Sequence, residues 1–104
     1  MDDKKLTSSI NILVEALRGG IARRQKIAEF QRMVWEERVD ASDPVFSVLK
    51  ELAYDLDFYE ASPRSRREDP TFFGDERFEA EVAAAFRKLR EAGVDVPDVN
   101  TGAR

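Results

Sequence analysis

The sequence predicts an all-α fold: a single four-helix bundle with a long loop before the last helix. Four segments place apolar residues at helical spacing, a polar stretch at residues 61–74 separates the third from the fourth, and no segment keeps the alternating pattern of a strand. The 104 residues have the length of one domain. We expect a helical bundle domain over residues 1–93 and a loosely ordered tail over residues 94–104.

The first predicted helix lies near the N-terminus and ends at two glycines, Gly19 and Gly20. Ser8 and Ser9 are its candidate capping residues. A second helix is expected to begin near residues 21–23. The apolar stripe of the first helix comprises Leu6, Ile10, Leu13, Val14 and Leu17, and that of the second comprises Ile27, Phe30, Met33 and Val34, with Trp35 at its edge.

The third predicted helix has the clearest start, because residues 42–44 combine a capping side chain with a proline suited to a first helical turn. It should end near residues 59–60. Tyr54 and Phe58 form an aromatic pair on the side opposite its core stripe. Either this helix packs on both sides, or the pair forms a patch that faces a partner. The core stripe is Val45, Leu49, Leu52, Ala53 and Leu56.

Residues 61–74 form a long polar connection that contains two prolines. We expect Phe72 and Phe73 to tether this loop by packing against the bundle, since long loops in compact domains are uncommon unless they have a role. Asp75 then caps or opens the fourth helix, which Gly93 closes. The stripe of the fourth helix is Phe78, Val82, Ala85, Phe86 and Leu89.

Cysteine and histidine are both absent from the chain. This removes thiolates and imidazoles as nucleophiles, bases and metal ligands, and no Gly-rich phosphate loop or HExxH motif occurs. We therefore expect no enzymatic activity, no catalytic residue, no metal site and no cofactor. The lack of cysteine, of a signal peptide and of an apolar run of roughly 20 residues predicts a cytoplasmic protein without membrane contact.

Negative charge is concentrated in the middle of the chain. Residues 40–81 carry 5 basic and 12 acidic side chains, whereas residues 1–39 carry 8 and 6 and residues 82–104 carry 4 and 3. An acidic surface repels nucleic acid and attracts a basic protein. The basic residues between positions 23 and 32 are typical of a solvated helix face, so we expect no nucleic-acid binding. Part of the acidity has a structural explanation, because carboxylates at residues 75–79 stabilise a helix N-terminus.

The region from residue 30 to residue 89 contains a spaced pattern of motifs: Leu-Ala-Tyr-Asp-Leu-Asp-Phe-Tyr-Glu at 52–60, Pro63, Arg-Arg-Glu-Asp-Pro at 66–70, Phe-Gly-Asp at 73–75 and the closing helix. With this pattern the region resembles the colicin D immunity protein family, a group of small bacterial self-protection proteins. Ala61 and Ser62 depart from the family pattern, which has more acidic character there.

Members of that family are helical bundles that bind a cognate ribonuclease toxin domain and block its tRNA-cleaving site with an acidic surface. The resemblance implies the same partner, a basic nuclease toxin domain, for this chain. The alternative is a helical interaction module of unrelated role, in which Tyr54 and Phe58 build a homodimer. The candidate partner-binding residues are Asp55, Asp57, Tyr59, Glu60, Glu68, Asp69, Asp75 and Glu76, which the long loop should bring together.

Overall fold

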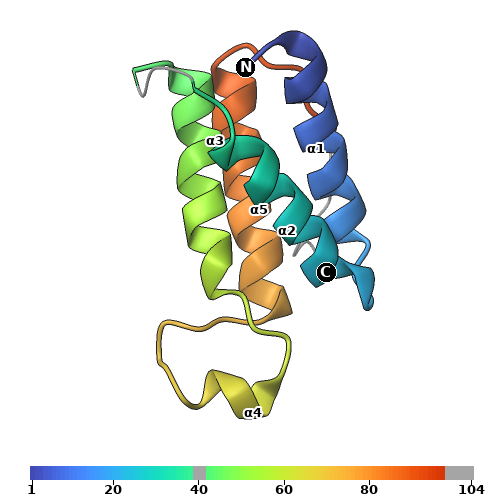
Figure 1. Cartoon of the computed structure of the whole chain (residues 1–104), viewed down its shortest axis with the longest axis vertical. Coiled ribbons are helices and arrows are strands. Elements are labelled where there is room, and N and C mark those ends of the chain that lie inside the picture. The colour runs from blue at the N-terminus through green and yellow to red at the C-terminus, as the bar shows by residue number, and fades with distance from the viewer. Residues whose placement is uncertain (39–41, 98–104) are drawn as a thin grey trace.

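The computed structural model describes residues 1–38 and 42–97, and in this part of the chain the structure is all-α (Figure 1). Four helices have 12 to 17 residues each, and no strand occurs among the described residues. The predicted fold class is confirmed at this level. The elements are α1 (Asp3–Leu17), α2 (Ala22–Trp35), α3 (Pro44–Asp55), the 3-10 turn η1 (Leu56–Phe58), α4 (Pro63–Arg66) and α5 (Asp75–Glu91).

Helix α1 begins earlier than the sequence predicts. The carboxylate of Asp2 caps it by accepting a hydrogen bond of 2.8 Å from the backbone N–H of Lys5. Ser9 is buried inside the helix, where its hydroxyl donates to the carbonyl of Leu6 at 2.9 Å. The prediction that Ser8 and Ser9 cap this helix is therefore wrong, because an acidic side chain takes the capping position before them.

Two glycines separate α1 from α2, as the sequence predicts. Gly19 and Gly20 both have φ near +80°, a left-handed conformation that glycine adopts without a steric penalty. Helix α2 starts at Ala22, and it buries Ile27, Phe30 and Val34 together with two polar side chains, Arg23 and Gln31. The burial of Arg23 corrects the prediction of a solvated basic face.

The predicted start of α3 is confirmed. Asp43 accepts hydrogen bonds from the backbone N–H groups of Val45 and Phe46 at 3.0 and 3.2 Å, and Pro44 occupies the first helical turn. Phe46, rather than the predicted Val45, points into the core, and Val45 is half-buried. The helix tightens at its end into the turn η1.

The core lies between the four long helices. Helix α1 packs on α2, α2 on α3, and α3 on α5, and Figure 1 shows α3 beside α5 with α2 crossing obliquely. The predicted stripe of α5 is buried throughout. Val94 donates its backbone N–H to the carbonyl of Leu89 at 2.9 Å and Val96 is buried, so these two valines pack against the core. Residues 98–104 of the predicted tail lie outside the described residues.

Backbone pairing closes the connection between α3 and α5. The N–H of Phe73 donates to the carbonyl of Phe58 at 3.0 Å, and the N–H of Glu60 donates to the carbonyl of Phe73 at 2.8 Å. Phe73 is buried, whereas Phe72 is half-buried. Arg66, at the end of α4, donates to the carbonyls of Glu60 and Ala61 at 2.7 and 3.2 Å. The segment therefore folds back on itself and holds the start of α5 beside the end of α3.

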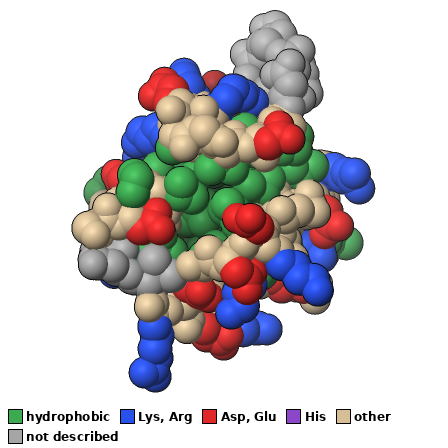
Figure 2. All heavy atoms as spheres, turned by 90° about the horizontal axis from the view of Figure 1, so that it is seen from above, with side chains coloured by type: hydrophobic (Ala, Val, Ile, Leu, Met, Phe, Trp, Pro, Cys, Tyr) green, Lys and Arg blue, Asp and Glu red, His purple; other side chains and the backbone are tan. Residues whose placement is uncertain are grey.

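The opposite end of the molecule, where α1 begins and α5 ends, looks different. Figure 2 shows hydrophobic side chains gathered across the middle of this end, with both acidic and basic side chains around them. No helix in the described part of the chain combines the length and the apolar character that crossing a membrane requires.

Candidate functional site

All eight predicted partner-binding residues lie between the end of α3 and the first turn of α5. Figure 1 places this segment at the end of the molecule that carries α4. We call residues 55–79 the acidic end, because they carry 8 acidic and 4 basic side chains. The pairing of Tyr59 with Phe73 brings its two acidic stretches, residues 55–60 and residues 68–76, to the same end of the fold.

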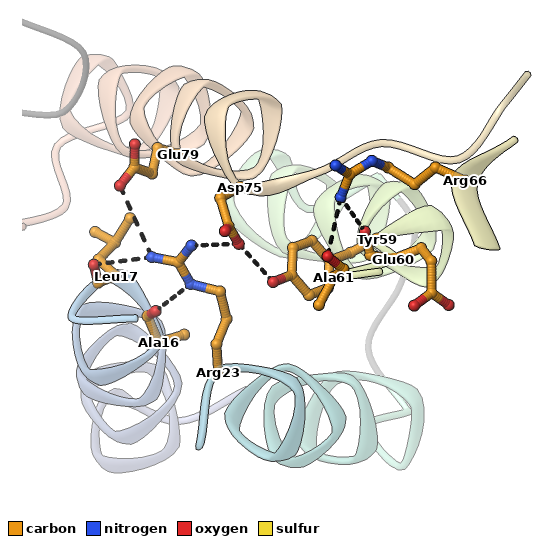
Figure 3. Close-up of polar contacts among 9 residues, drawn as sticks. All are labelled: Ala16, Leu17, Arg23, Tyr59, Glu60, Ala61, Arg66, Asp75 and Glu79. Carbon is orange, nitrogen blue, oxygen red and sulfur yellow. Dashed lines mark hydrogen bonds and ion pairs between the residues drawn. The ribbon is translucent and has the colours of Figure 1, made fainter. Parts of the chain in front are cut away.

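Arg23 anchors the acidic end to the other helices, although it belongs to α2. Its Nε donates to the carbonyl of Ala16 at 2.8 Å, which also accepts from the backbone N–H of Gly19, and its Nη2 donates to the carbonyl of Leu17 at 3.1 Å, so it caps the end of α1 (Figure 3). Its Nη1 forms an ion pair of 2.8 Å with Asp75, and Nη2 lies 3.8 Å from Glu79. One guanidinium thereby joins three helices.

Tyr59 completes this network from the segment after α3. Its hydroxyl donates to the same Oδ1 of Asp75 that Arg23 contacts, at a distance of 2.5 Å (Figure 3). The hydrogen bond from Tyr59, followed by the contact with Arg23, holds the pKa of Asp75 below its ordinary value. Burial and then the neighbouring carboxylate raise the pKa of Tyr59.

This geometry changes the interpretation of two predicted contact residues. Tyr59 is 4% exposed, so it does not lie on the surface, and it acts by positioning Asp75. The prediction that Tyr59 itself touches a partner does not fit its burial. Asp75 keeps 65% of its side chain exposed, although one of its oxygens is already bound by Arg23 and Tyr59.

Asp55 lies on the side of α3 that faces α5. It lines a hollow with Glu51 and Leu52 of α3 and with Glu81 and Lys88 of α5. Burial, and then the negative charges of Glu81 and Glu51, raise the pKa of Asp55, against the smaller opposing effect of nearby cations.

The sequence prediction missed the two carboxylates beside Asp55. Glu51 and Asp55 are four residues apart and therefore adjacent on one helix, a signal that the sequence contains. The approach of Glu81 depends on how α5 packs on α3. Within residues 1–38 and 42–97, no group of three acidic side chains has an arrangement that would hold a metal ion.

The remaining predicted residues spread around the acidic end rather than forming a single face. Asp57 is exposed and accepts a hydrogen bond of 3.4 Å from Nε2 of Gln31. The carboxylate of Glu60 turns inward and accepts from the backbone N–H of Ser62 at 3.1 Å. In the part of the chain that the structure describes, Glu68 and Glu76 are the two exposed residues of the predicted set for which no hydrogen bond of this kind is found.

Asp69 stabilises the loop that follows α4. Its Oδ1 accepts hydrogen bonds from the backbone N–H and the hydroxyl of Thr71, at 2.9 and 2.7 Å. These two bonds lower the pKa of Asp69. The carboxylate therefore stays ionised at the surface and at the same time forms a local turn.

The arginines of the acidic end form no ion pair with its own carboxylates, although the charge of Arg66 helps to lower the pKa of Asp75. Arg66 binds the backbone carbonyls of Glu60 and Ala61. Arg77 lies over the ring of Phe73, with 5.1 Å between guanidinium carbon and ring centre, and pairs with Glu81 at 3.4 Å. Within residues 55–79, which the structure describes in full, no ion pair joins two members of the segment.

The aromatic pair on the outer side of α3 lies next to the acidic end. Tyr54 is 64% exposed and meets the half-buried Phe58 edge to face, with 5.7 Å between ring centres. The sequence left open whether α3 packs on both sides. The structure shows that no other described helix covers α3 at Tyr54. A second hollow lies beside the pair and is lined by Tyr54, Asp55, Phe58, Pro70, Thr71, Phe73 and Arg77.

Comparison of the chain with models of known protein families, with curated proteins and with solved structures finds no match. The function proposed below rests on the side chains described above and on the resemblance found in the sequence.

Proposed function

We propose that this chain is an immunity-type inhibitor that binds a basic bacterial ribonuclease toxin domain through the acidic end and blocks the tRNA-cleaving site of that domain. One observation carries the proposal: no ion pair joins two residues of the fully described segment 55–79, because Arg66 binds backbone carbonyls and Arg77 pairs with Glu81 outside the segment. The family resemblance of the sequence supports the same partner.

The chemistry of the target explains why such a surface inhibits. A domain that cleaves tRNA must be basic, because it binds phosphate groups. The exposed carboxylates of Asp57, Glu68 and Glu76 carry the opposite charge to such a surface. Complementary charge raises the rate of association and favours the correct partner over others. An acidic protein that covers the phosphate-binding surface competes directly with the RNA.

We further propose that the four long helices act as a bundle that supports the acidic end as a rigid, pre-shaped surface. The Arg23–Asp75–Tyr59 network and the Tyr59–Phe73 pairing hold the start of α5 against α2 and α3. A pre-formed surface loses little conformational entropy on binding. Inhibition by occupation also needs no nucleophile, metal or cofactor, which suits a chain without cysteine or histidine.

The test measures tRNA cleavage by the nuclease domain encoded beside this chain, with and without the purified protein. Equimolar protein should stop cleavage. The variant Asp57→Lys/Glu68→Lys/Glu76→Lys should inhibit at least tenfold less well, because three exposed carboxylates of the acidic end are reversed. Its matched control is Glu36→Lys/Glu91→Lys/Asp95→Lys, which changes the net charge equally at exposed positions outside the acidic end. Full cleavage in the presence of excess wild-type protein contradicts the proposal.

The exposure of Tyr54 favours a second candidate function, a helical interaction module that forms a homodimer through Tyr54 and Phe58. Light scattering across a range of protein concentrations distinguishes the two. A dimer that Tyr54→Ala converts to a monomer supports the second function, and a monomer at all concentrations supports the inhibitor.

A further inference from the structure

We infer that the hollow beside Tyr54 docks an arginine side chain of a basic protein partner, with the guanidinium over the Tyr54 ring and its N–H groups directed at the carboxylate of Asp55, beside which Glu51 adds a second negative charge. This inference rests on the proposed function and adds a specific contact to it. The contact lies beside Tyr54 of α3, next to the exposed carboxylates of the acidic end, and it does not use Asp57, Glu68 or Glu76, on which the test of the proposed function depends.

The aromatic wall of the hollow is exposed and held in place. Tyr54 is 64% exposed, yet its ring meets Phe58 edge to face and is supported by it. Phe58 is in turn half-buried against the core. Exposed aromatic side chains that are fixed in this way are typical of the energetically dominant contacts in protein interfaces.

The charge around the hollow favours a cation. Asp55 lines both this hollow and the neighbouring one between α3 and α5, which Glu51 and Glu81 also line. Burial and the crowded negative charges of Glu81 and Glu51 raise the pKa of Asp55, despite the cations Arg77 and Lys88 nearby. Among the described residues, Glu81 has an ion-pair partner, whereas Asp55 and Glu51 lie in no ion pair. A cation from outside would relieve this crowding.

Two arginines of the chain already pack a guanidinium on an aromatic ring. Arg77 lies over the ring of Phe73 in the same hollow, at 5.1 Å, and Arg23 lies over the ring of Phe78 at 4.6 Å. The planar guanidinium stacks on an aromatic ring while its N–H groups bind carboxylate oxygens at the edge. Lysine has a compact, strongly hydrated charge and fits this combination less well.

Charge also argues against a second copy of this chain as the occupant. A two-fold symmetric contact would bring together the same patch of both copies, and with it their Glu51 and Asp55 carboxylates. The chain has a net charge of −4, which adds to the repulsion between copies. A basic partner has neither problem.

The experiment is a titration of the ¹⁵N-labelled full chain with the peptide acetyl-Arg-Phe-Arg-amide, followed by nuclear magnetic resonance. Saturable shift changes should concentrate at the backbone amides of Tyr54, Asp55, Phe58 and Thr71. The same peptide with citrulline in place of both arginines should leave these signals unchanged, because citrulline keeps the shape and lacks the charge.

Variants distinguish binding of the peptide in the hollow from non-specific attraction of a basic peptide to an acidic protein. Tyr54→Ala and Glu51→Gln/Asp55→Asn should each weaken peptide binding about tenfold or more. Trp35→Ala is the matched control, since Trp35 is also an exposed aromatic residue, at 54%, and does not line the hollow. The inference is overturned by shifts spread over all acidic surfaces, by no shift at millimolar peptide, or by equal binding to Tyr54→Ala. Concentration-dependent shifts at these residues without peptide would identify a second copy as the occupant.

The nuclease domain distinguishes failure of this inference from failure of the proposed function. If the wild-type chain inhibits the nuclease and Tyr54→Ala inhibits equally well, the arginine contact is wrong and the inhibitor function stands. If the wild-type chain binds the peptide in the hollow but leaves tRNA cleavage unchanged, the arginine contact stands and the inhibitor function is wrong.

Discussion

Arg23 of α2 and Asp75 of α5 are 52 positions apart in the chain and form an ion pair of 2.8 Å. The arginine is 5% exposed, and its remaining N–H groups bind the carbonyls of Ala16 and Leu17 at the end of α1. The first turn of α5 is therefore joined through Arg23 to α2 and to the end of α1. The stability of the fold and the geometry of the acidic end depend on the same side chain.

Replacing Arg23 with alanine should lower the free energy of unfolding by about 2–4 kcal/mol, because the carbonyls of Ala16 and Leu17 each lose a hydrogen bond and the guanidinium no longer packs on the ring of Phe78. Urea denaturation followed by circular dichroism measures this. Arg32→Ala is the control, since Arg32 is exposed on the same helix, and it should change stability by less than about 0.5 kcal/mol. A cost below about 1 kcal/mol for Arg23→Ala would contradict the structural role.

Acid should destabilise the protein partly through Asp75. The hydrogen bond from Tyr59 and the contact with Arg23 hold the pKa of Asp75 below its value in the unfolded chain, about 3.9. This carboxylate therefore contributes stability above about pH 4 and loses that contribution as the pH falls through its lower folded-state pKa. Between about pH 5 and about pH 3, the urea midpoint of the wild type should fall more steeply than that of Asp75→Asn. Parallel curves would show that the pKa is not lowered.

Asp55 should have the opposite effect on stability. Burial and the charges of Glu81 and Glu51 raise its pKa, so the folded state takes up a proton more readily than the unfolded chain, and the charged carboxylate lowers stability at neutral pH. Asp55→Asn should therefore stabilise the protein at pH 7, by about 0.2–0.5 kcal/mol from the adjacent charge of Glu51 alone. The gain should shrink as the pH falls and the wild-type carboxyl becomes protonated. A carboxylate that costs stability fits a role in binding.

Gly74 leaves room for the guanidinium of Arg66. A Cβ at this position would lie 2.6 Å from Nη1 of Arg66, although the backbone of Gly74, with φ of −106°, suits any residue. Gly74→Ala should displace Arg66 from the carbonyls of Glu60 and Ala61 and cost about 1 kcal/mol.

Hydrogen exchange of the amides in residues 61–67 provides the measurement for Gly74. Exchange there should speed up in Gly74→Ala, while the amides of α1 stay protected. Arg66→Ala should have the same effect, and the double variant should add little to either change, because both act on one contact. Additive effects would show that Gly74 is required for another reason.

The sequence predicted most of the fold because the signals for helices act over a few residues. The stripe of α5, the cap and proline at the start of α3, and the two glycines after α1 each operate within one or two helical turns. The cap of α1 was misassigned because Asp2, Ser8 and Ser9 are all acceptable capping residues in isolation.

The candidate site was less predictable, because its residues are far apart in the sequence and come together only in the folded protein. The sequence by itself determined that one segment would be acidic and that an aromatic pair would lie off the core stripe of α3.

Only the tertiary structure decided that Tyr59 is buried against Asp75, that Arg23 leaves the solvated face, and that Glu81 approaches Asp55. The physical reason is that hydrogen bonds and close ion pairs depend on the distance between groups in space, whatever their separation along the chain. Helix packing sets those distances, and no local pattern encodes it.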